Sequence, residues 1–378
     1  MREEFDALQC NRTWKLAPRP PRANVITGKW VFRHRTRPDG SLERYKACRV
    51  VRSFRQRAGV DFTDTFAPVV KPGTIRTVLQ LAVSRAWPVH QLDVSNAFLH
   101  GHLDEQVFCQ QPTGFIGIDY PDHVCLLSRS LYGLKQAPQA WYQQIAAFLQ
   151  QQGFRSTRSD ASLFVYHQGP ATVYLILYVD DIIPTASSPA LLQQITARPD
   201  IEFVLTDLGA LHYPLGIEVV RRATDFFMHQ QKYAYKLLER AGMLNCKPDP
   251  TPIDTKAKVF VVDGSPASDA PFYRSIVDAL QYLTLTRPDI QYAVQQVCLH
   301  MHAPRDTHWA LVKRILRYIR GTTAMGLTLT ASPDTSLVAY SDADWAGCPD
   351  TRRSTSGYCV YLGPSLISWS SKRQPTVS

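Results

Sequence analysis

The feature that constrains this chain most is a pair of adjacent aspartates, Asp180 and Asp181, at the end of its most apolar strand-like run, residues 173–179. Asp93 likewise stands near the end of another apolar run, residues 87–94. Ionised carboxylates are costly beside a hydrophobic core unless something pairs with them, and Mg²⁺, which takes oxygen ligands, is a natural partner. Because aspartates also begin turns, the pattern alone leaves a two-metal site and a plain turn both open.

The order of helix-like and strand-like patterns predicts an α+β fold. Both kinds are present: apolar residues at helical spacing over 74–85 and 139–153, and strand-like runs over 162–166 and 173–179. The residues at 168–170, Gln-Gly-Pro, predict a turn between the two runs. A sheet with helices on one face accounts for this alternation.

Two hairpins are also predicted. The Asp-Gly dipeptide at 39–40 separates strand-like runs at 29–33 and 43–46, and Asp-Gly is a strong hairpin-turn signal. Further along the chain, the apolar runs 218–220 and 226–228 are close enough to pair in the same way.

The net charge and the hydropathy of the chain indicate which kinds of partner it can bind. The 378 residues suffice for two or three domains, and 42 Lys and Arg against 32 Asp and Glu give a formal net charge of +10. That excess favours a polyanion such as nucleic acid, although a basic protein without such a partner remains an alternative. The chain shows neither a membrane-spanning apolar stretch nor a signal peptide, so an intracellular, cytoplasmic protein is expected.

Cysteines and histidines argue against a structural metal site. The eight cysteines form no Cys-x-x-Cys pair, which argues against zinc and fits reduced thiols. His300, His302 and His308 lie near Cys298, but their spacing matches no known ligand pattern. Surface or hydrogen-bonded histidines are therefore favoured over a metal cluster.

The last predicted helix has a basic face opposite an apolar one. The apolar residues are Val312, Ile315, Leu316 and Ile319, and the basic ones Lys313, Arg314, Arg317 and Arg320. A basic helical face is usually just solvated, and a phosphate backbone is the alternative partner here. The stretch 245–270, rich in Pro, Asp and Lys, predicts a link between subdomains.

Several motifs in one order resemble a known family. They are Tyr178-Val179-Asp180-Asp181, the segments 92–101 and 131–138, the pair 44–47 and 54–62, and the pair 207–209 and 215–218. In this order the chain is similar to the reverse-transcriptase region of a copia-type LTR retrotransposon gag-pol polyprotein. The resemblance, which runs from about Glu4 to the end of the chain, implies a right-hand polymerase with fingers, palm and thumb.

The resemblance also implies a metal site. Asp93, Asp180 and Asp181 are the expected catalytic metal ligands, helped by the backbone carbonyl of Val94. Two Mg²⁺ ions, with Mn²⁺ as a substitute, are the expected cofactors for in-line displacement at phosphorus.

Four further residues are implied to contact the nucleotide. Phe98, five residues after Asp93, stands where the family places the aromatic that crowds the sugar 2′ position. Gln136 is expected to contact the incoming nucleotide. Lys46 and Arg52 are candidates to grip the triphosphate, with exposed bases on a hairpin as the alternative.

The resemblance also implies the partners: an RNA template, a DNA primer and deoxynucleoside triphosphates. The expected setting is a virus-like particle, and no membrane is expected as a partner.

The expected divisions are 1–228 for fingers and palm, 229–334 for thumb and connecting helices, and 335–378 for the truncated start of an RNase H-like sheet. Asp342 matches that domain's first metal-binding carboxylate. The strands of this last part are expected to lack covering helices and to expose an apolar face.

Some positions depart from the family pattern. Pro184 and Pro214 fall in expected strands, where proline is tolerated at an edge or a bulge. Pro199 ends a helix early, and Asp278 replaces a small residue in a helix. Cys48 and Ser53 replace residues that are usually Arg and Gly. These changes favour an alternative function, a degenerate or domesticated fragment that binds nucleic acid without catalysis.

Overall fold

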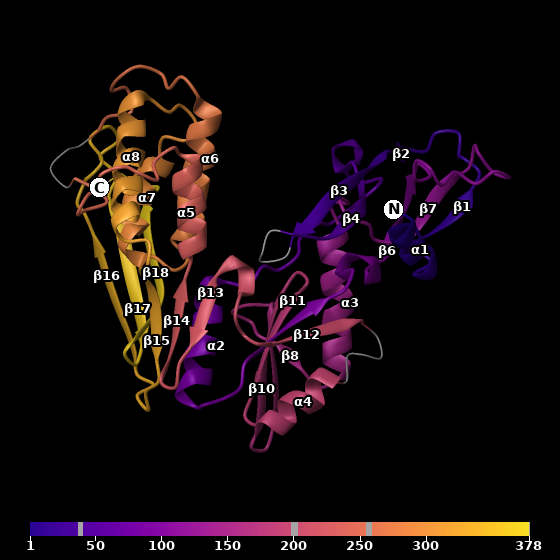
Figure 1. Ribbon diagram of the computed structural model, residues 1–378, viewed down its shortest axis with the longest axis horizontal. Coiled ribbons are helices and arrows are strands. Elements are labelled where there is room, and N and C mark those ends of the chain that lie inside the picture. Colours follow the sequence, from indigo (N-terminus) through magenta and orange to yellow (C-terminus); the bar gives the residue numbers. More distant parts are fainter. Residues whose placement is uncertain (37–40, 198–202, 255–258, 378) are drawn as a thin grey trace. The chain divides into compact units, whose positions relative to one another are not determined.

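The structure, a computed structural model, describes residues 1–36, 41–197, 203–254 and 259–377 (Figure 1). By their contacts the residues divide into two compact units, each made of segments that are separated in sequence. The first unit comprises residues 1–70, 92–184 and 188–208, and the second comprises residues 71–91, 185–187 and 209–378. The three-part division expected from the sequence stays a prediction.

The largest sheet among the described residues has six strands in the spatial order β12-β5-β11-β10-β9-β8. Their bounds are Leu205–Ala210 (β12), His90–Val94 (β5), Asp181–Ala186 (β11), Ala171–Tyr178 (β10), Leu163–Gln168 (β9) and Arg155–Ser156 (β8). β9 and β10 pair antiparallel across a tight turn, with Ala171 opposite Gln168. The two strands and the turn predicted over 162–179 are therefore confirmed.

Two helices, α3 (Ala137–Gln151) and α4 (Pro189–Ala197), pack against this sheet. Side chains from both helices and from β5, β10 and β11 close around a cavity of only about 20 Å³. α3 begins two residues before its predicted start, and Pro138 falls in its first turn, where a missing N–H costs nothing. The helices cover the sheet as the sequence predicts.

Smaller elements complete the first unit. They are α1 (Arg2–Cys10), the sheet β1-β7-β6-β2 with bounds Trp14–Ala17, Val124–Arg129, His102–Cys109 and Val25–Ile26, the pair β3 (Gly28–Thr36) and β4 (Leu42–Val51), and the 3₁₀ helices η1 (Ser53–Arg55) and η2 (Ala97–His100). The turn predicted at 39–40 lies outside the described residues. The antiparallel pairing of β3 with β4 on either side agrees with the predicted hairpin.

The second unit contains a helical core. Its helices are α2 (Pro72–Ser84), α5 (Gln231–Arg240), α6 (Ala270–Leu283), α7 (Gln291–Cys298) and α8 (Asp306–Gly321), with 3₁₀ helices η4 (Pro214–Gly216) and η5 (Pro288–Ile290). One hydrophobic cluster joins α5, α6, α7 and α8, and it includes the predicted apolar face of α8. No helix in the described part of the chain has the apolar length that a bilayer crossing requires.

The basic face of α8 is bonded within the second unit. Arg314 and Arg317 both reach Asp249, at 3.5 and 3.4 Å, and Arg320 donates to a carbonyl oxygen of the same segment at 2.6 Å. Lys313 is exposed. The segment between α5 and α6 thus lies along α8. Three of the four basic side chains of α8 bind residues of this segment. The suggestion that this face follows a phosphate backbone is not supported, because the Asp249 carboxylate pairs with Arg314 and Arg317 and offsets their charge.

The second unit also contains two antiparallel three-stranded sheets. One has the order β13-β14-β15, with bounds Glu218–Arg221, Asp225–His229 and Gly326–Thr330, and the other the order β16-β17-β18, with bounds Leu337–Ala343, Thr355–Leu362 and Ser365–Arg373. The hairpin predicted over 218–228 is confirmed as β13 and β14.

The last sheet is covered on its β18 side. Arg76 of α2 donates to the carbonyl oxygen of Ile367 at 3.0 Å and stands 3.7 Å above the centre of the Trp369 ring. Arg373 donates to Gln296 of α7 at 3.3 Å. The expectation that these strands lack covering helices is therefore wrong for β18. It holds for β16, whose residues are all exposed.

The two prolines singled out in the sequence differ in their surroundings. Pro184 is buried inside β11, which has β5 on one side and β10 on the other, so it does not lie at a sheet edge. Pro214 begins η4 rather than interrupting a strand, and a proline is compatible with the first helical position. The expectation of a strand at Pro214 was wrong. Pro199 lies outside the described residues.

Candidate active site

The ladder between β5 and β11 brings two of the predicted aspartates together. Asp93 and Asp181 are direct partners in this antiparallel pair. Directly opposite residues project to the same face, with Cβ atoms roughly 4.5–5.5 Å apart. The backbone N–H of Val94 donates to the carbonyl oxygen of Asp180 at 2.9 Å, so all three aspartates stand at one end of this strand pair.

A strained turn carries Asp180. Val179, between β10 and β11, has a φ of 55°, a left-handed conformation that is uncommon for a β-branched residue. The indole N–H of Trp141, on α3, donates to the carbonyl oxygen of Val179 at 2.5 Å. The buried tryptophan therefore holds in place the turn that presents the acid.

The electrostatic surroundings of Asp180 mix repulsion and attraction. Partial burial raises the pKa of the Asp180 carboxyl, the charge of Asp93 raises it further, and the Lys46 ammonium opposes both. Lys46 extends from β4 and is exposed. The charge of Lys46 therefore acts on Asp180. The role expected from the sequence, binding of the triphosphate, stays a prediction.

The donor set suits a hard cation by its chemistry. Carboxylate and carbonyl oxygens are the ligands that Mg²⁺ prefers. Over the described ranges, however, no group of three or more His, Cys, Asp or Glu side chains is gathered as a metal site. The carboxylates of Asp93 and Asp180 repel each other, and a bound cation would relieve that repulsion.

Phe98 lies on η2 and contacts a residue that sequence reasoning missed. Its ring meets the ring of Tyr132 edge-on, with centroids 5.3 Å apart and planes at 75°. Burial raises the pKa of the Tyr132 phenol, and the nearby charges of Cys48, Glu4, Asp180 and Asp93 raise it further. Tyr132 therefore contacts Phe98 and is close enough to Asp180 and Asp93 to be affected by their charges. Its place within the motif at 131–138 is the signal that could have found it.

Gln136 has its side chain occupied within the protein. Its Oε1 accepts from Gln56 at 2.9 Å, and its Nε2 donates to the carbonyl oxygen of Asp61 at 2.7 Å. The side chain is only 2% exposed. Direct contact with a nucleotide stays a prediction, and it would require these bonds to break. Arg52 is exposed beside η1, and its backbone N–H donates to Thr27 at 2.9 Å.

Asp342 is exposed on β16, where it pairs with Gly357 in the ladder. Its Oδ1 accepts from the N–H of Ala343 at 2.8 Å. Asp344 lies beyond the end of β16 and accepts from the N–H of Thr355. Both acids therefore serve local backbone bonds.

The histidines near Cys298 stack instead of gathering around a centre. The rings of His300 and His308 are 3.6 Å apart at 16°. Since Arg305 donates its backbone N–H to Nδ1 of His308, Nε2 of that ring carries the proton and donates to Phe260 at 3.2 Å. Burial and the neighbouring His308 lower the pKa of His300 to about 4. Burial also lowers the pKa of His308, so both rings are neutral near pH 7.

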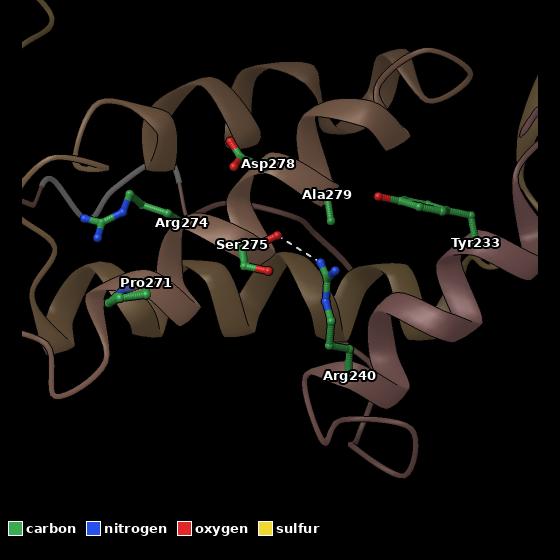
Figure 2. Close-up of a pocket in the computed structure, with 7 residues that line it drawn as sticks. All are labelled: Tyr233, Arg240, Pro271, Arg274, Ser275, Asp278 and Ala279. Carbon is green, nitrogen blue, oxygen red and sulfur yellow. Dashed lines mark hydrogen bonds between the residues drawn. The ribbon is translucent and has the colours of Figure 1, made fainter. Parts of the chain in front are cut away.

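A groove with a volume of about 560 Å³ lies between α5 and α6 in the second unit (Figure 2). It is lined by Tyr233, Arg240, Pro271, Arg274, Ser275, Asp278 and Ala279. Arg240 donates to the carbonyl oxygen of Ser275 at 2.9 Å, and Arg274 donates to that of Met301 at 3.3 Å. The groove therefore combines two arginines with one exposed acid, Asp278.

Comparison with known proteins identifies the family. The family model described as reverse transcriptase (RNA-dependent DNA polymerase) matches residues 11–255. The Retrovirus-related Pol polyproteins from transposons RE2 and RE1 of Arabidopsis thaliana are 46% and 47% identical to this chain over its whole length. The corresponding polyprotein from transposon TNT 1-94 of Nicotiana tabacum is 39% identical, again over the whole chain. The chain spans 26%, 26% and 29% of these relatives. It belongs to the reverse transcriptase (RNA-dependent DNA polymerase) family, in the form found in copia-type retrotransposon Pol polyproteins.

Proposed function

We propose that this chain is an RNA-directed DNA polymerase, which adds deoxynucleotides to the 3′ end of a DNA primer on an RNA template. One observation carries the proposal: Asp93 stands opposite Asp181 in the β5–β11 ladder, with Asp180 hydrogen-bonded through its backbone to the neighbouring Val94. Two carboxylates that face each other in this ladder, with a third at its end, suit metal-assisted displacement at phosphorus.

The three aspartates and the carbonyl oxygen of Val94 would hold two Mg²⁺ ions, for which Mn²⁺ is a substitute. When bound, such ions supply a lowered pKa at the primer hydroxyl and neutralise the triphosphate. The protein contributes position. The Trp141–Val179 bond holds Asp180 in its turn, and the β5–β11 ladder sets the spacing of the other two acids.

The nucleotide contacts follow from charge and shape. Lys46 already acts electrostatically on Asp180, and we assign it and Arg52 to the triphosphate. Phe98 excludes a sugar with a 2′-hydroxyl. Gln136, which binds Gln56 and Asp61, supports the nucleotide pocket by holding these loops and contacts the nucleotide if those bonds exchange.

The groove between α5 and α6 is assigned to the phosphate backbone of the template–primer duplex. Arg240 and Arg274 line it, and two cations in an open groove favour a polyanion. Within this proposal, residues 1–228 form fingers and palm, 229–334 the thumb and connecting helices, and 335–378 an RNase H-like sheet bearing Asp342. We further propose that the polymerase acts inside a virus-like particle in the cytoplasm.

Primer extension on the purified chain tests the proposal. With an RNA template, a labelled DNA primer, deoxynucleotides and Mg²⁺, the primer should lengthen, and Asp93→Asn, Asp180→Asn and Asp181→Asn should each abolish this. Asp122→Asn removes an exposed acid of the same unit and should retain activity. Binding of the template–primer without extension would instead favour a degenerate fragment. Extension by any of the three variants at the wild-type rate would overturn the site assignment.

A further inference from the structure

The segment before α3 braces η2, the 3₁₀ helix that carries Phe98. The backbone N–H of Ser130 donates to the carbonyl oxygen of Gly101 at 2.8 Å. The Ser130 hydroxyl donates to the carbonyl oxygen of Phe98 itself. Two residues on, the ring of Tyr132 meets that of Phe98, as described above. Backbone and side chain of Phe98 are therefore both held by one short segment, residues 130–132.

That segment is itself fixed against β4. The N–H of Val51 donates to the carbonyl oxygen of Tyr132 at 2.8 Å. Gly133 follows with a φ of 94°, and a Cβ at this position would collide with the carbonyl oxygen of Val51. The close approach requires glycine at 133. The backbone from which the Tyr132 ring projects toward Phe98 is therefore fixed to β4.

The contact between the two rings is uncharged. Acids lie around the Tyr132 phenol, from Glu4 on α1 to Asp93 and Asp180, and Lys46 is the cation that acts on two of them. Burial of the phenol, reinforced by these acids, raises its pKa and keeps it protonated at working pH. What Tyr132 presents to Phe98 is thus a neutral aromatic ring, whose edge-to-face packing sets the orientation of its neighbour.

We infer that Tyr132 is a positioning residue that holds the ring of Phe98 against the sugar of the incoming nucleotide, and that it thereby sharpens the exclusion of ribonucleotides. The inference rests on the proposed polymerase function. It assigns a role to Tyr132 that acts through Phe98, with no contact to the reacting atoms.

The test measures the rate of ribonucleotide incorporation relative to deoxynucleotide incorporation. Tyr132→Ala should raise this ratio by between about twofold and tenfold, the equivalent of one aromatic pair. Tyr132→Phe keeps the ring and should leave the ratio within about twofold of wild type, below the range of one aromatic pair. Tyr166→Ala is the matched control, because Tyr166 also pairs with an aromatic ring of the first unit, Phe154 at 5.6 Å.

A double variant separates positioning from an independent effect. If Tyr132 acts through Phe98, adding Tyr132→Ala to Phe98→Ala should raise the ratio no further than Phe98→Ala alone. A full additional increase in the double variant, or a ratio for Tyr132→Ala equal to that of wild type, would overturn the inference while the polymerase function stood.

A second measurement does not depend on activity. With 4-fluorophenylalanine placed at position 98 of the full chain, the fluorine resonance reports the order of that ring. In the Tyr132→Ala chain this resonance should shift and sharpen, since the ring loses its neighbour, and in Tyr132→Phe it should stay near the wild-type position. An unchanged resonance in Tyr132→Ala would refute the positioning role. A wild-type chain that fails to extend a primer would refute the proposed function separately.

Discussion

The indole nitrogen of Trp141 is hydrogen-bonded to the carbonyl oxygen of Val179, and this bond joins α3 to the turn in front of the paired aspartates. Val179 has positive φ, so the turn stores strain that its surroundings must balance. The Trp141 side chain is only 1% exposed, so its indole N–H lies in the core. The carbonyl oxygen that it binds belongs to the turn next to Asp180.

Trp141→Phe should strongly reduce the rate of primer extension while lowering the free energy of unfolding only slightly. The variant keeps a buried aromatic ring and removes one hydrogen bond, for which about 1 kcal/mol of unfolding free energy is expected. Primer extension should fall further, because Asp180 loses its support. Trp30→Phe is the control, since Trp30 also donates its indole N–H to a backbone carbonyl, that of Thr113 at 3.0 Å. Equal losses of activity in both variants would show that the Trp141 bond has no special relation to the site.

Asp180→Asn should stabilise the fold at neutral pH in the presence of EDTA. Burial and the charge of Asp93 raise the pKa of Asp180 above its usual 3.8, so the folded protein binds this proton more tightly than the unfolded chain does. The cost of ionising Asp180 therefore appears as the pH rises through the raised pKa and is fully present at pH 7. The variant should melt at a higher temperature than wild type at pH 7, and the difference should vanish near pH 3. A difference in melting temperature that does not depend on pH would contradict this account.

Pro184 and Pro214 should respond oppositely to replacement. Pro184→Val restores an N–H inside β11 and adds a β-branched side chain, so the thermal midpoint should rise by roughly 2–4 °C per kcal/mol gained. Valine is chosen because Pro184 lines the small cavity under α3, which leaves little room for a larger residue. Pro214→Ala removes a residue suited to the start of η4 and should give no increase. A rise at position 214 without one at 184 would reverse this assignment.

Asp278→Asn should tighten binding of nucleic acid. The change removes the single acid that lines the α5–α6 groove beside Arg240 and Arg274. Affinity for an RNA–DNA hybrid, measured by fluorescence anisotropy at several salt concentrations, should rise most at low salt. Glu239→Gln removes one negative charge from an exposed position of α5 outside the groove. An equal gain from this control would mean that net charge alone determines the affinity.

The 378-residue chain should not cleave the RNA strand of a hybrid. Asp342 is exposed and bonded to the backbone of Ala343, and two-metal cleavage needs several converging carboxylates. Incubation with a hybrid labelled in its RNA strand, with Mg²⁺ or Mn²⁺, is the measurement. Loss of the RNA strand that requires the metal and disappears in Asp342→Asn would show that a cleavage site does form.

Periodicity located the elements because it reports burial directly. The strand over 173–179 was predicted from an apolar run and the apolar face of α8 from helical spacing, and both are present. The partners of the polar side chains were not predictable in this way. Arg314 and Arg317 have the same pattern whether they bind phosphate or Asp249, and only the path of the chain between α5 and α6 decides between them.

The same distinction between predictable and unpredictable features holds for the candidate site. That Asp93 and the Asp180–Asp181 pair follow apolar runs was visible in the sequence, and the β5–β11 register then set Asp93 opposite Asp181. The contact of Tyr132 with Phe98 was not visible, because it joins a turn to a single 3₁₀ turn, and neither sequence carries a periodic pattern. The 3₁₀ helix at Pro214 was missed for a similar reason, since a single turn is too short to show a period.

The interleaving of the two units along the chain has a consequence for synthesis. Residues 71–91 leave the ribosome long before residues 209–378, with which they form the second unit. Until those later residues emerge, the apolar side chains of α2 lack β14, β15 and β18, the strands against which α2 packs. Contacts so distant in sequence slow folding. A nascent chain of this kind should therefore depend on chaperones that shield residues 71–91 until translation is complete.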